Sequence, residues 1–328
     1  MNKLIPLLTL AGFLITPSLA QGKPKRLPTK PASDAKQSSK NASRKTPELK
    51  DFESKPRRFW FFSSLSTSFD TNIDHEPQAI GSFGLVPSMG FHFQDNAEKP
   101  AFELEYEVGL HRYTNTDEWD RTSHSLRASY KRRLFDRWYS RTTGELTLKG
   151  SSEDRELNNQ SVLGQQIEYR ATSNIRLIAF AAYRLKRDPF DRGKNAIDPY
   201  IGAKFVQRLP GNRRLDFRYR YDHNRSQDPR NRYVRWAYGA SFETPVLRHD
   251  RLTFDFSYRP QLYARTVKVD HTRVPRADQR WNFTVLWERP LGERLKLSMF
   301  YRFEKRFSND PDKRYIEHEP GIQLSYWW

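Results

Sequence analysis

Most of the chain after residue 58 alternates between apolar and polar side chains. Residues 102–111, 215–222 and 234–243 show the pattern most clearly, with an aromatic or aliphatic side chain at nearly every second position. A period of two is that of a β-strand. The alternating runs are nine to thirteen residues long, whereas strands of soluble domains average about five or six and a tilted membrane strand needs about ten. The pattern therefore predicts strands that cross a membrane.

The lengths of the gaps between these runs point to a closed barrel. We expect fourteen strands, near residues 58–71, 83–94, 101–113, 122–134, 138–150, 159–171, 174–186, 197–209, 214–223, 232–244, 251–263, 279–289, 294–307 and 315–328. The odd-numbered gaps are long and polar, as at 72–82 and 264–278, and the even-numbered gaps are mostly tight, as at 135–137 and 172–173. The sequence thus predicts an all-β fold, a transmembrane antiparallel up-and-down β-barrel of about 14 strands. Pro87, Pro260 and Pro320 fall within strands, where we expect bulges or strand ends.

The composition agrees with a barrel because its interior can be polar. The mean hydropathy is −0.89, 29% of the residues are charged and 14% are aromatic. Beyond the first twenty residues no apolar stretch is long enough for a transmembrane helix. A membrane barrel needs apolar side chains on its outer face alone, and aromatic residues form the girdles at the two membrane interfaces.

The first twenty residues have the features of a secretory signal peptide. Lys3 is followed by an apolar run from Leu4 to Ile15, and Ser18 and Ala20 have the small side chains of a cleavage site. We expect cleavage before Gln21 and a multi-pass protein in the outer membrane of a Gram-negative cell envelope. The chain has no cysteine, which excludes a lipid anchor on cysteine and disulfides.

Residues 21–58 form a basic, low-complexity segment. They carry twelve Lys or Arg against four acidic residues and lack the apolar surface that would offset the entropy of ordering. We predict a disordered periplasmic segment, either a solvated spacer or a tether to an anionic periplasmic polymer. The barrel then spans residues 59–328, with the C-terminus also in the periplasm. Expected partners are outer membrane lipids and the barrel assembly machinery, and no nucleic acid.

Two short segments resemble known families. Ile322, Leu324, Tyr326 and Trp328 lie on one face of a strand and resemble the C-terminal signal that the barrel assembly machinery reads, although Trp328 stands where Phe is usual. Residues 68–73, Ser-Phe-Asp-Thr-Asn-Ile, are similar to the pattern that opens the barrel of surface lipoprotein assembly modifiers. That resemblance covers at most residues 58–328 and implies fourteen strands and export of surface lipoproteins. The family's periplasmic helical-repeat domain has no counterpart in this sequence.

The alternation also predicts which charged residues face the barrel interior. The candidates for lumen-facing residues are Arg127, Arg170, Arg218, Arg220, Arg235, Arg259, Arg280, Glu103, Glu105 and Glu107. These charges can pair across the wall and orient one another. Alternatively, they line a water-filled passage in which an excess of guanidinium groups favours anions.

Signs of enzyme chemistry are few. Asp222 and His223 could form an acid–histidine pair, but neighbours in a strand point to opposite faces; His111 and His124 could approach each other on adjacent strands without a carboxylate cluster. Residues 223–226 do not fit the His-x-Ser-Asn-Gly stretch of outer membrane phospholipases. We expect no catalytic, cofactor-binding or metal site. The predicted function is a porin-like channel or transport pore with weak anion preference. The alternatives are a partner-assisted export barrel for surface lipoproteins, and a surface enzyme or adhesin built on the loops.

Overall fold

The structure is a computed structural model that describes residues 59–72, 75, 77, 80–95, 101–115, 120–151, 159–247, 249–269 and 271–328. The predicted signal peptide (residues 1–20) and basic segment (residues 21–58) lie outside the described residues, as does Ile73. None of the helical turns among the described residues is long or apolar enough to cross a membrane.

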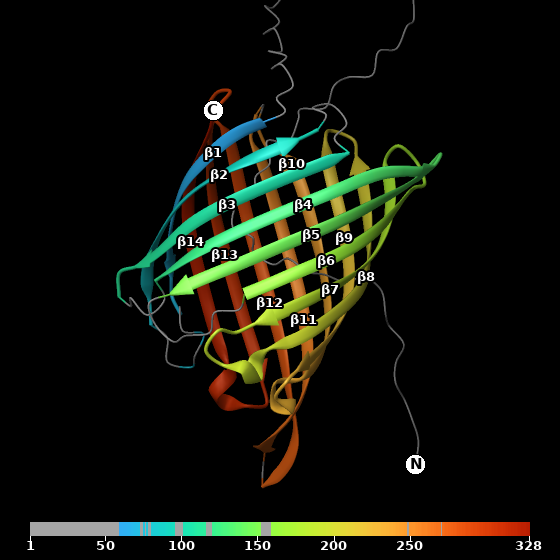
Figure 1. Cartoon of the computed structure of the whole chain (residues 1–328). Helices are drawn as coiled ribbons and strands as arrows, with labels where there is room; N and C mark the ends of the chain where they lie inside the picture. Colours follow the sequence, from blue (N-terminus) through green and yellow to red (C-terminus); the bar gives the residue numbers. More distant parts are fainter. Residues whose placement is uncertain are drawn as a thin grey trace, which may run out of the picture.

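Fourteen antiparallel strands close into one barrel, which confirms the predicted fold class (Figure 1). The strands are β1 (Phe59–Asp70), β2 (Ser82–Gln94), β3 (Phe102–Tyr113), β4 (Arg121–Phe135), β5 (Trp138–Ser151), β6 (Asn159–Arg170), β7 (Ile175–Arg187), β8 (Ala196–Leu209), β9 (Arg213–Ser226), β10 (Tyr233–Pro245), β11 (Arg251–Val269), β12 (Thr272–Pro290), β13 (Leu295–Ser308) and β14 (Tyr315–Trp327). Each strand pairs with its neighbours in sequence, and β1 pairs with β14.

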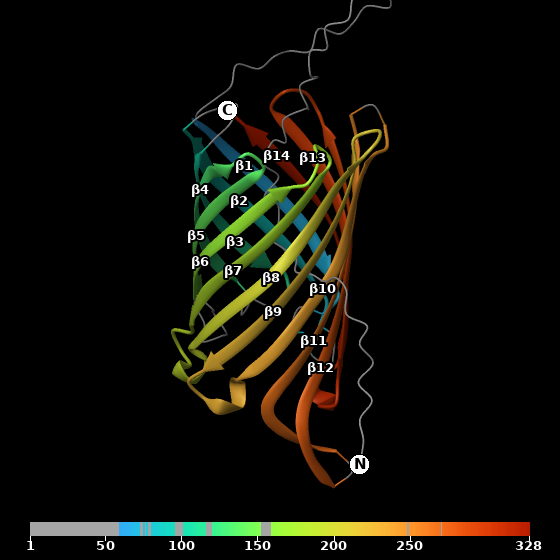
Figure 2. The same ribbon diagram turned by 90° about the vertical axis from the view of Figure 1, so that its right-hand side faces the viewer.

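The two ends of the barrel differ in the length of their connections. Because Phe62 of β1 lies opposite Trp327 of β14, the first strand begins and the last strand ends at the same end (Figures 1 and 2). The connections 136–137, 171–174, 210–212, 246–250 and 291–294 at this end are short, and we call it the turn end. Longer connections lie at the opposite loop end, where η2 (Arg192–Lys194), η3 (Pro229–Asn231) and η4 (Pro311–Lys313) form short 3-10 turns.

The expected loop between β11 and β12 is wrong. Residues 264–278, expected as a loop, largely continue β11 and β12, whose pairing extends to Val269 opposite Thr272 after a register shift between Leu262 and Thr266. The hairpin extends beyond the rest of the loop end (Figure 2). Its residues lack the strict apolar alternation of the other strands, and the backbone ladder is supplemented by an ion pair of Arg265 with Asp310 at 2.8 Å.

The prolines do not shift the strands. The register of β2 with β3 is the same before and after Pro87, and that of β10 with β11 is the same on both sides of Pro260. In both ladders the proline and one adjacent residue have no paired residue on the neighbouring strand, because proline has no N–H to donate. Pro320 lies opposite Tyr301 in an unbroken ladder, and the pairing of β14 with β1 ends at the adjacent Gly321.

The inner and outer faces of the barrel differ in chemistry. Successive side chains of a strand point to opposite faces, and directly opposed residues of neighbouring strands share a face. The outer face exposes large apolar side chains such as Leu65, Met89 and Leu163, while the most deeply buried side chains on the inner face include Asp198 and Asp222. An aromatic group that contains Phe59, Phe61, Phe91 and Trp328 lies on the outer face at the turn end. The barrel therefore has a polar interior and an apolar exterior, as a membrane barrel requires.

Glycines make room for the few large apolar side chains on the inner face. Gly202 lies directly opposite Phe180, and Gly321 directly opposite Phe300. A Cβ atom at Gly202 would lie 2.4 Å from the Phe180 ring, and one at Gly321 would lie 2.2 Å from the Phe300 ring. Each ring therefore lies across a glycine of the neighbouring strand instead of extending straight towards the barrel axis.

Candidate functional site

The strand register places all ten predicted lumen candidates on the inner face. On β9, for example, Arg218 and Arg220 share a face with Asp222, whereas Tyr219 and Tyr221 of the same strand take part in the outer aromatic contacts. Whether a residue holds an odd or an even position in its strand, its parity, decides this placement, because successive side chains point to opposite faces. The structure divides these residues among three inner-face regions, described in turn.

The first region lies on β7–β10 and centres on two fully buried carboxylates, Asp198 and Asp222. Asp198 accepts hydrogen bonds from Arg184, at 2.5 Å from Nη2, and lies 2.9 Å from Nζ of Lys186. Nε of Arg220 lies 2.7 Å from one oxygen of Asp222, and Nε of Arg235 lies 2.8 Å from the other. Four cations therefore share two carboxylates in this region.

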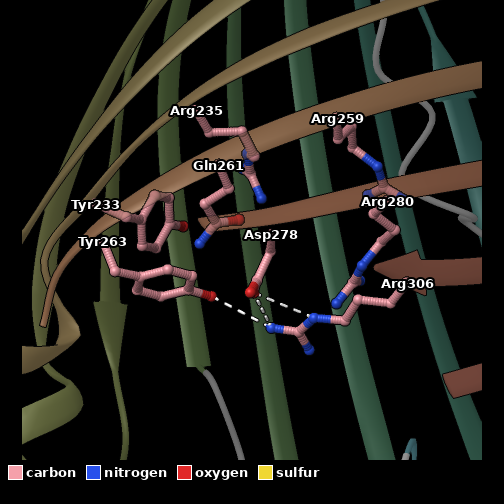
Figure 3. A pocket seen from close by; sticks show the side chains of 8 residues that line it. All are labelled: Tyr233, Arg235, Arg259, Gln261, Tyr263, Asp278, Arg280 and Arg306. Carbon is pink, nitrogen blue, oxygen red and sulfur yellow. Dashed lines mark hydrogen bonds and ion pairs between the residues drawn. The ribbon is translucent and has the colours of Figure 1, made fainter. Parts of the chain in front are cut away.

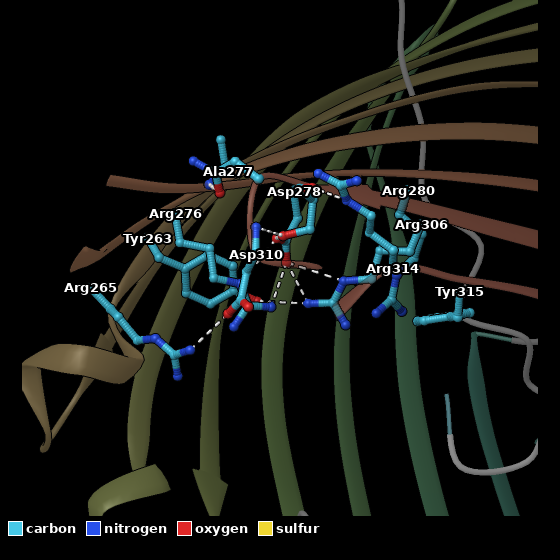
Figure 4. Close-up of polar contacts among 12 residues, drawn as sticks. Tyr263, Arg265, Arg276, Ala277, Asp278, Arg280, Arg306, Asp310, Arg314 and Tyr315 are labelled. Atoms are coloured by element: carbon cyan, nitrogen blue, oxygen red, sulfur yellow. Dashed lines mark hydrogen bonds and ion pairs between the residues drawn. The ribbon is translucent and has the colours of Figure 1, made fainter. Parts of the chain in front are cut away.

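The second region lies on β11–β13 and has the same ratio of cations to carboxylates. Glu304 pairs with Nε of Arg280 at 3.0 Å and with Nη2 of Arg259 at 3.5 Å. Asp278 receives a two-pronged hydrogen bond from Arg276, at 3.0 and 2.7 Å, and pairs also with Arg306 (Figure 4). Again there are two cations for each carboxylate.

We call these two regions together the arginine wall. It comprises Arg184, Lys186, Arg220, Arg235, Arg259, Arg276, Arg280 and Arg306, with Asp198, Asp222, Asp278 and Glu304. Its acidic residues are each shared by at least two cations, so the wall keeps a positive excess after pairing. Fixed charges of this kind attract anions.

A pocket of about 190 Å³ opens in the arginine wall. Its lining residues are Tyr233, Arg235, Arg259, Gln261, Tyr263, Asp278, Arg280 and Arg306 (Figure 3). The alternation along the chain does not by itself reveal this pocket. A signal was present in the alternation of Arg259, Gln261 and Tyr263 on one strand and of Arg276, Asp278 and Arg280 on the next, but the register that brings them together cannot be read from the sequence.

The third region, on β2–β6, holds the predicted glutamates. Glu105 accepts a hydrogen bond from, or pairs with, His92 at 3.1 Å, and Glu103 lies 3.2 Å from the hydroxyl of Ser129. Arg127 pairs with Glu145 at 3.1 Å. Arg170, at the turn end, pairs with Glu168 at 2.7 Å. Cations share carboxylates here too, because Lys131 and Arg176 lie 3.6 and 3.8 Å from Glu168 in addition to Arg170.

Arg218 and Glu107 also lie on the inner face. Arg218 is directly opposite Lys204 on one side and Gly239 on the other. Glu107 is opposite Ser125 and Gly90. Their ladder partners are therefore a like charge or small neutral residues, so neither has an oppositely charged residue directly across the ladder.

The histidine arrangements considered for catalysis do not form. Asp222 points inward to Arg220 and Arg235, while His223 is on the outer face opposite Val234. His111 shares the inner face with Arg121, whereas His124 is on the outer face opposite Val108, near Tyr106. In each pair the two side chains therefore lie on opposite sides of the wall.

One group of possible metal ligands lies at the loop end. His75, Glu304 and Glu317 hold their ligand atoms within 4.8 Å of one another, and Nδ1 of His75 lies 2.8 Å from Glu317. Burial lowers the pKa of His75, but the hydrogen bond and charge of Glu317 outweigh it, so the pKa lies above its ordinary value. Arg259 and Arg280 already bind Glu304, and their charges oppose a metal cation here.

Strand β14 and the residue that follows it, Trp328, carry the predicted assembly signal. Ile322, Leu324, Tyr326 and Trp328 are all exposed on the outer face, and the Trp328 ring stacks on that of Phe61 with centroids 6.2 Å apart. Recognition of these residues by the assembly machinery stays a prediction.

The seam where β14 meets β1 has small, uncharged inner residues. Ser64, Ser66 and Ser68 of β1 lie opposite Ser325, Gln323 and Gly321 of β14. We call these six residues the serine seam. None of them carries a charge, so ion pairs cannot form among them. Backbone pairing and small side chains therefore close the barrel.

Known outer membrane proteins share this fold. The anion-selective porin from Comamonas acidovorans covers 82% of this chain with 98% of its own, at a TM-score of 0.51 and 8% identity. An outer membrane channel from Pseudomonas putida F1 covers 85% with 98% of its own, at a TM-score of 0.48 and 14% identity. OmpT of Vibrio cholerae covers 82% with 97% of its own, at a TM-score of 0.46 and 10% identity.

Neither a protein-family model nor a curated protein matches the sequence. The finer resemblance of residues 68–73 to surface lipoprotein assembly modifiers therefore has no support from these comparisons. At identities this low, the likeness to solved structures concerns the fold alone. This chain has the closed β-barrel fold of bacterial outer membrane proteins.

Proposed function

We propose that the protein is a non-enzymatic outer membrane channel that passes small solutes and weakly prefers anions. The observation that carries the proposal is the arginine wall, in which each carboxylate is shared by at least two cations. A polar lumen with a positive excess concentrates anions by electrostatic attraction. The fold shared with an anion-selective porin is compatible with this proposal but does not by itself supply it.

The same proposal places the turn end in the periplasm. The start of β1 and the end of β14 lie at the turn end, together with the short connections. Bacterial barrels have short periplasmic turns and longer external loops. Residues 1–20 would be removed on export. Residues 21–58 would then extend into the periplasm, where their positive charge could hold an anionic polymer.

Conductance in planar bilayers tests the channel directly. We expect steady openings of roughly nanosiemens size and a reversal potential in a KCl gradient that shows a modest preference for chloride. The preference should be strongest at low salt, because salt screens charges beyond about 10 Å at 0.1 M. A closed barrel without conductance would contradict the channel, and a preference for potassium would contradict the role of the arginine wall.

Arg218→Ser combined with Arg220→Ser should weaken the anion preference. The two side chains lie on the inner face of β9, and their removal takes two positive charges from the lumen. A suitable control is Arg133→Ser, because Arg133 lies at the turn end and pairs with the exposed Asp136 at 2.5 Å. The control should leave the reversal potential close to that of the unchanged protein.

A partner-assisted export barrel for surface lipoproteins is the second candidate. Fourteen strands agree with that family's barrel, and residues 68–72 lie where β1 ends at the loop end. Deletion of the gene in the native host would then reduce lipoproteins at the cell surface without changing permeation of small anions.

A further inference from the structure

We infer that the pocket in the arginine wall is a binding site for solutes that carry two or more oxyanion groups about 5 Å apart. The inference deepens the proposed channel function, since such solutes would reach the pocket through the lumen. It concerns the lining residues Arg259, Arg280 and Arg306, together with Tyr233, Gln261 and Tyr263.

The first observation is a row of like charges across three strands. Arg259 of β11 lies directly opposite Arg280 of β12, and Arg280 lies directly opposite Arg306 of β13. Like charges in directly opposed positions destabilise a sheet. A polyanion bound along the row would remove that repulsion.

The second observation is that the protein's own acidic residues do not satisfy the row. Glu304 is shared by Arg259 and Arg280, and Asp278 is shared by Arg276 and Arg306. Arg259 is only 9% exposed, yet its Nε has no hydrogen-bond partner among the described residues. A buried donor of this kind normally has a partner, and an anion in the pocket would supply one.

The third observation concerns the neutral groups. Gln261 makes no side-chain hydrogen bond within the part of the chain that the structure describes, and it lines the pocket beside Tyr233 and Tyr263. The two tyrosine rings lie 5.6 Å apart in an edge-to-face arrangement. The pocket therefore offers an amide and two phenol groups beside its guanidinium groups, which suit an organic acid or an organic phosphate.

The spacing of the strands determines the spacing of charges on the ligand. Neighbouring strands are about 4.7–4.9 Å apart, so successive guanidinium groups of the row are attached roughly 5 Å apart. Arginine binds carboxylate and phosphate groups with two parallel hydrogen bonds. One oxyanion can therefore satisfy part of the row, whereas two or three groups at this spacing can satisfy all of it.

Calorimetry on the detergent-solubilised full chain at low salt tests the site, with citrate and inorganic tripolyphosphate as probes. We expect both to bind at one site and to bind at least tenfold more tightly than acetate or monophosphate. Tighter binding of citrate would identify carboxylic acids as the natural class, and tighter binding of tripolyphosphate would identify phosphates. Equal weak binding of all four probes would overturn the inference.

Two variants separate the site from the general positive charge of the lumen. Arg280→Gln should weaken citrate or tripolyphosphate binding about tenfold, as expected for loss of a charged hydrogen bond. Arg259→Lys keeps the charge but loses Nε, so it should weaken binding of the probes although the net charge of the lumen stays the same. Affinity that stays unchanged in both variants would contradict the site.

Arg251→Gln is the matched control. Arg251 lies on the inner face of β11, the strand of Arg259, but at the turn end. It pairs with Glu243 at 3.0 Å and does not line the pocket. This variant should bind the probes normally, and equal losses in Arg251→Gln and Arg280→Gln would show that only net charge matters.

Retarded migration on boiling should confirm a folded barrel for each variant. A barrel that binds the probes but does not conduct would refute the channel alone, and a conducting barrel that does not bind them would refute the site alone.

Discussion

The arginine wall and the serine seam are two different ways of building the polar part of the inner face. In the arginine wall, buried charges on β7–β13 bind one another, as Arg220 and Arg235 bind Asp222. In the serine seam, small neutral residues such as Ser66 and Gln323 are buried with little to hold them beyond the backbone ladder. The comparison teaches that closure of the barrel and charge in its lumen depend on different strands.

The largest effect should follow from removal of a carboxylate in the arginine wall. Asp222→Ala leaves Arg220 and Arg235 buried without their main partner, which costs about 3–5 kcal/mol of unfolding free energy. Urea unfolding in detergent measures the loss. Asp136→Ala breaks an exposed ion pair with Arg133 and should cost less than about 1 kcal/mol. Equal losses would mean that the wall contributes no more than a surface pair.

A smaller effect should follow at the turn end of the seam. Trp328 is exposed on the outer face, whereas Trp327 is on the inner face opposite Phe62, with Lys296 over its ring at 5.6 Å. Trp328→Asp places a charge towards lipid, at a cost of up to about 2 kcal/mol. Immunoblots of outer membranes should show much less Trp328→Asp than Trp327→Asp protein. Equal amounts would show that the facing of this strand does not matter for insertion.

The ion pair of His75 with Glu317 of β14 should contribute a small, pH-dependent stability. Its folded-state pKa is raised, so the protonated form is favoured in the folded protein. The contribution is fully present below about pH 6.5, the unfolded value, and is lost as the pH rises through the raised folded value. Because the side chain is 44% exposed, we expect less than about 1 kcal/mol. His75→Ala should lower the melting temperature at pH 5.5 more than at pH 9.

A disulfide across the serine seam should have the smallest effect, because we expect it to leave the conductance unchanged. Ser66 and Gln323 are directly opposed, and opposed residues of antiparallel strands have Cα atoms roughly 4.5–5.5 Å apart, which a disulfide can span. The chain has no cysteine of its own to interfere. Ser66→Cys with Gln323→Cys should cross-link on oxidation without altering unit conductance. A conductance that changes reversibly with reductant would instead show that the seam moves during transport.

The sequence was enough to predict the barrel because a membrane wall imposes strict alternation. Outer residues contact lipid and inner residues do not, so the parity that separates Tyr219 from Arg220 is visible in the chain. The extension of β11 and β12 to Val269 and Thr272 was missed because it lies beyond the band where apolar outer residues are required. The bulges or strand ends expected at Pro87 and Pro260 do not occur at these residues, because a missing donor removes a bond without moving the register.

The candidate site was predictable only in part. Parity indicates that Arg259 and Arg280 share the inner face, but the register between strands decides that they are directly opposed. The register depends on strand tilt and on the bulge after Leu262, neither of which has a signature in the residues. Which carboxylate each cation binds, and hence the pocket itself, therefore became visible only in three dimensions.

The rings that lie across glycines have an evolutionary consequence. Phe180 can occupy an inner position of β7 because Gly202 on β8 has no Cβ to displace the ring. A larger residue at 202 would push the ring towards the barrel axis, whereas the loss of the ring would leave the backbone at Gly202 exposed to the lumen. Among homologues, the two positions should therefore change together, as should Phe300 and Gly321, even where the surrounding charges diverge.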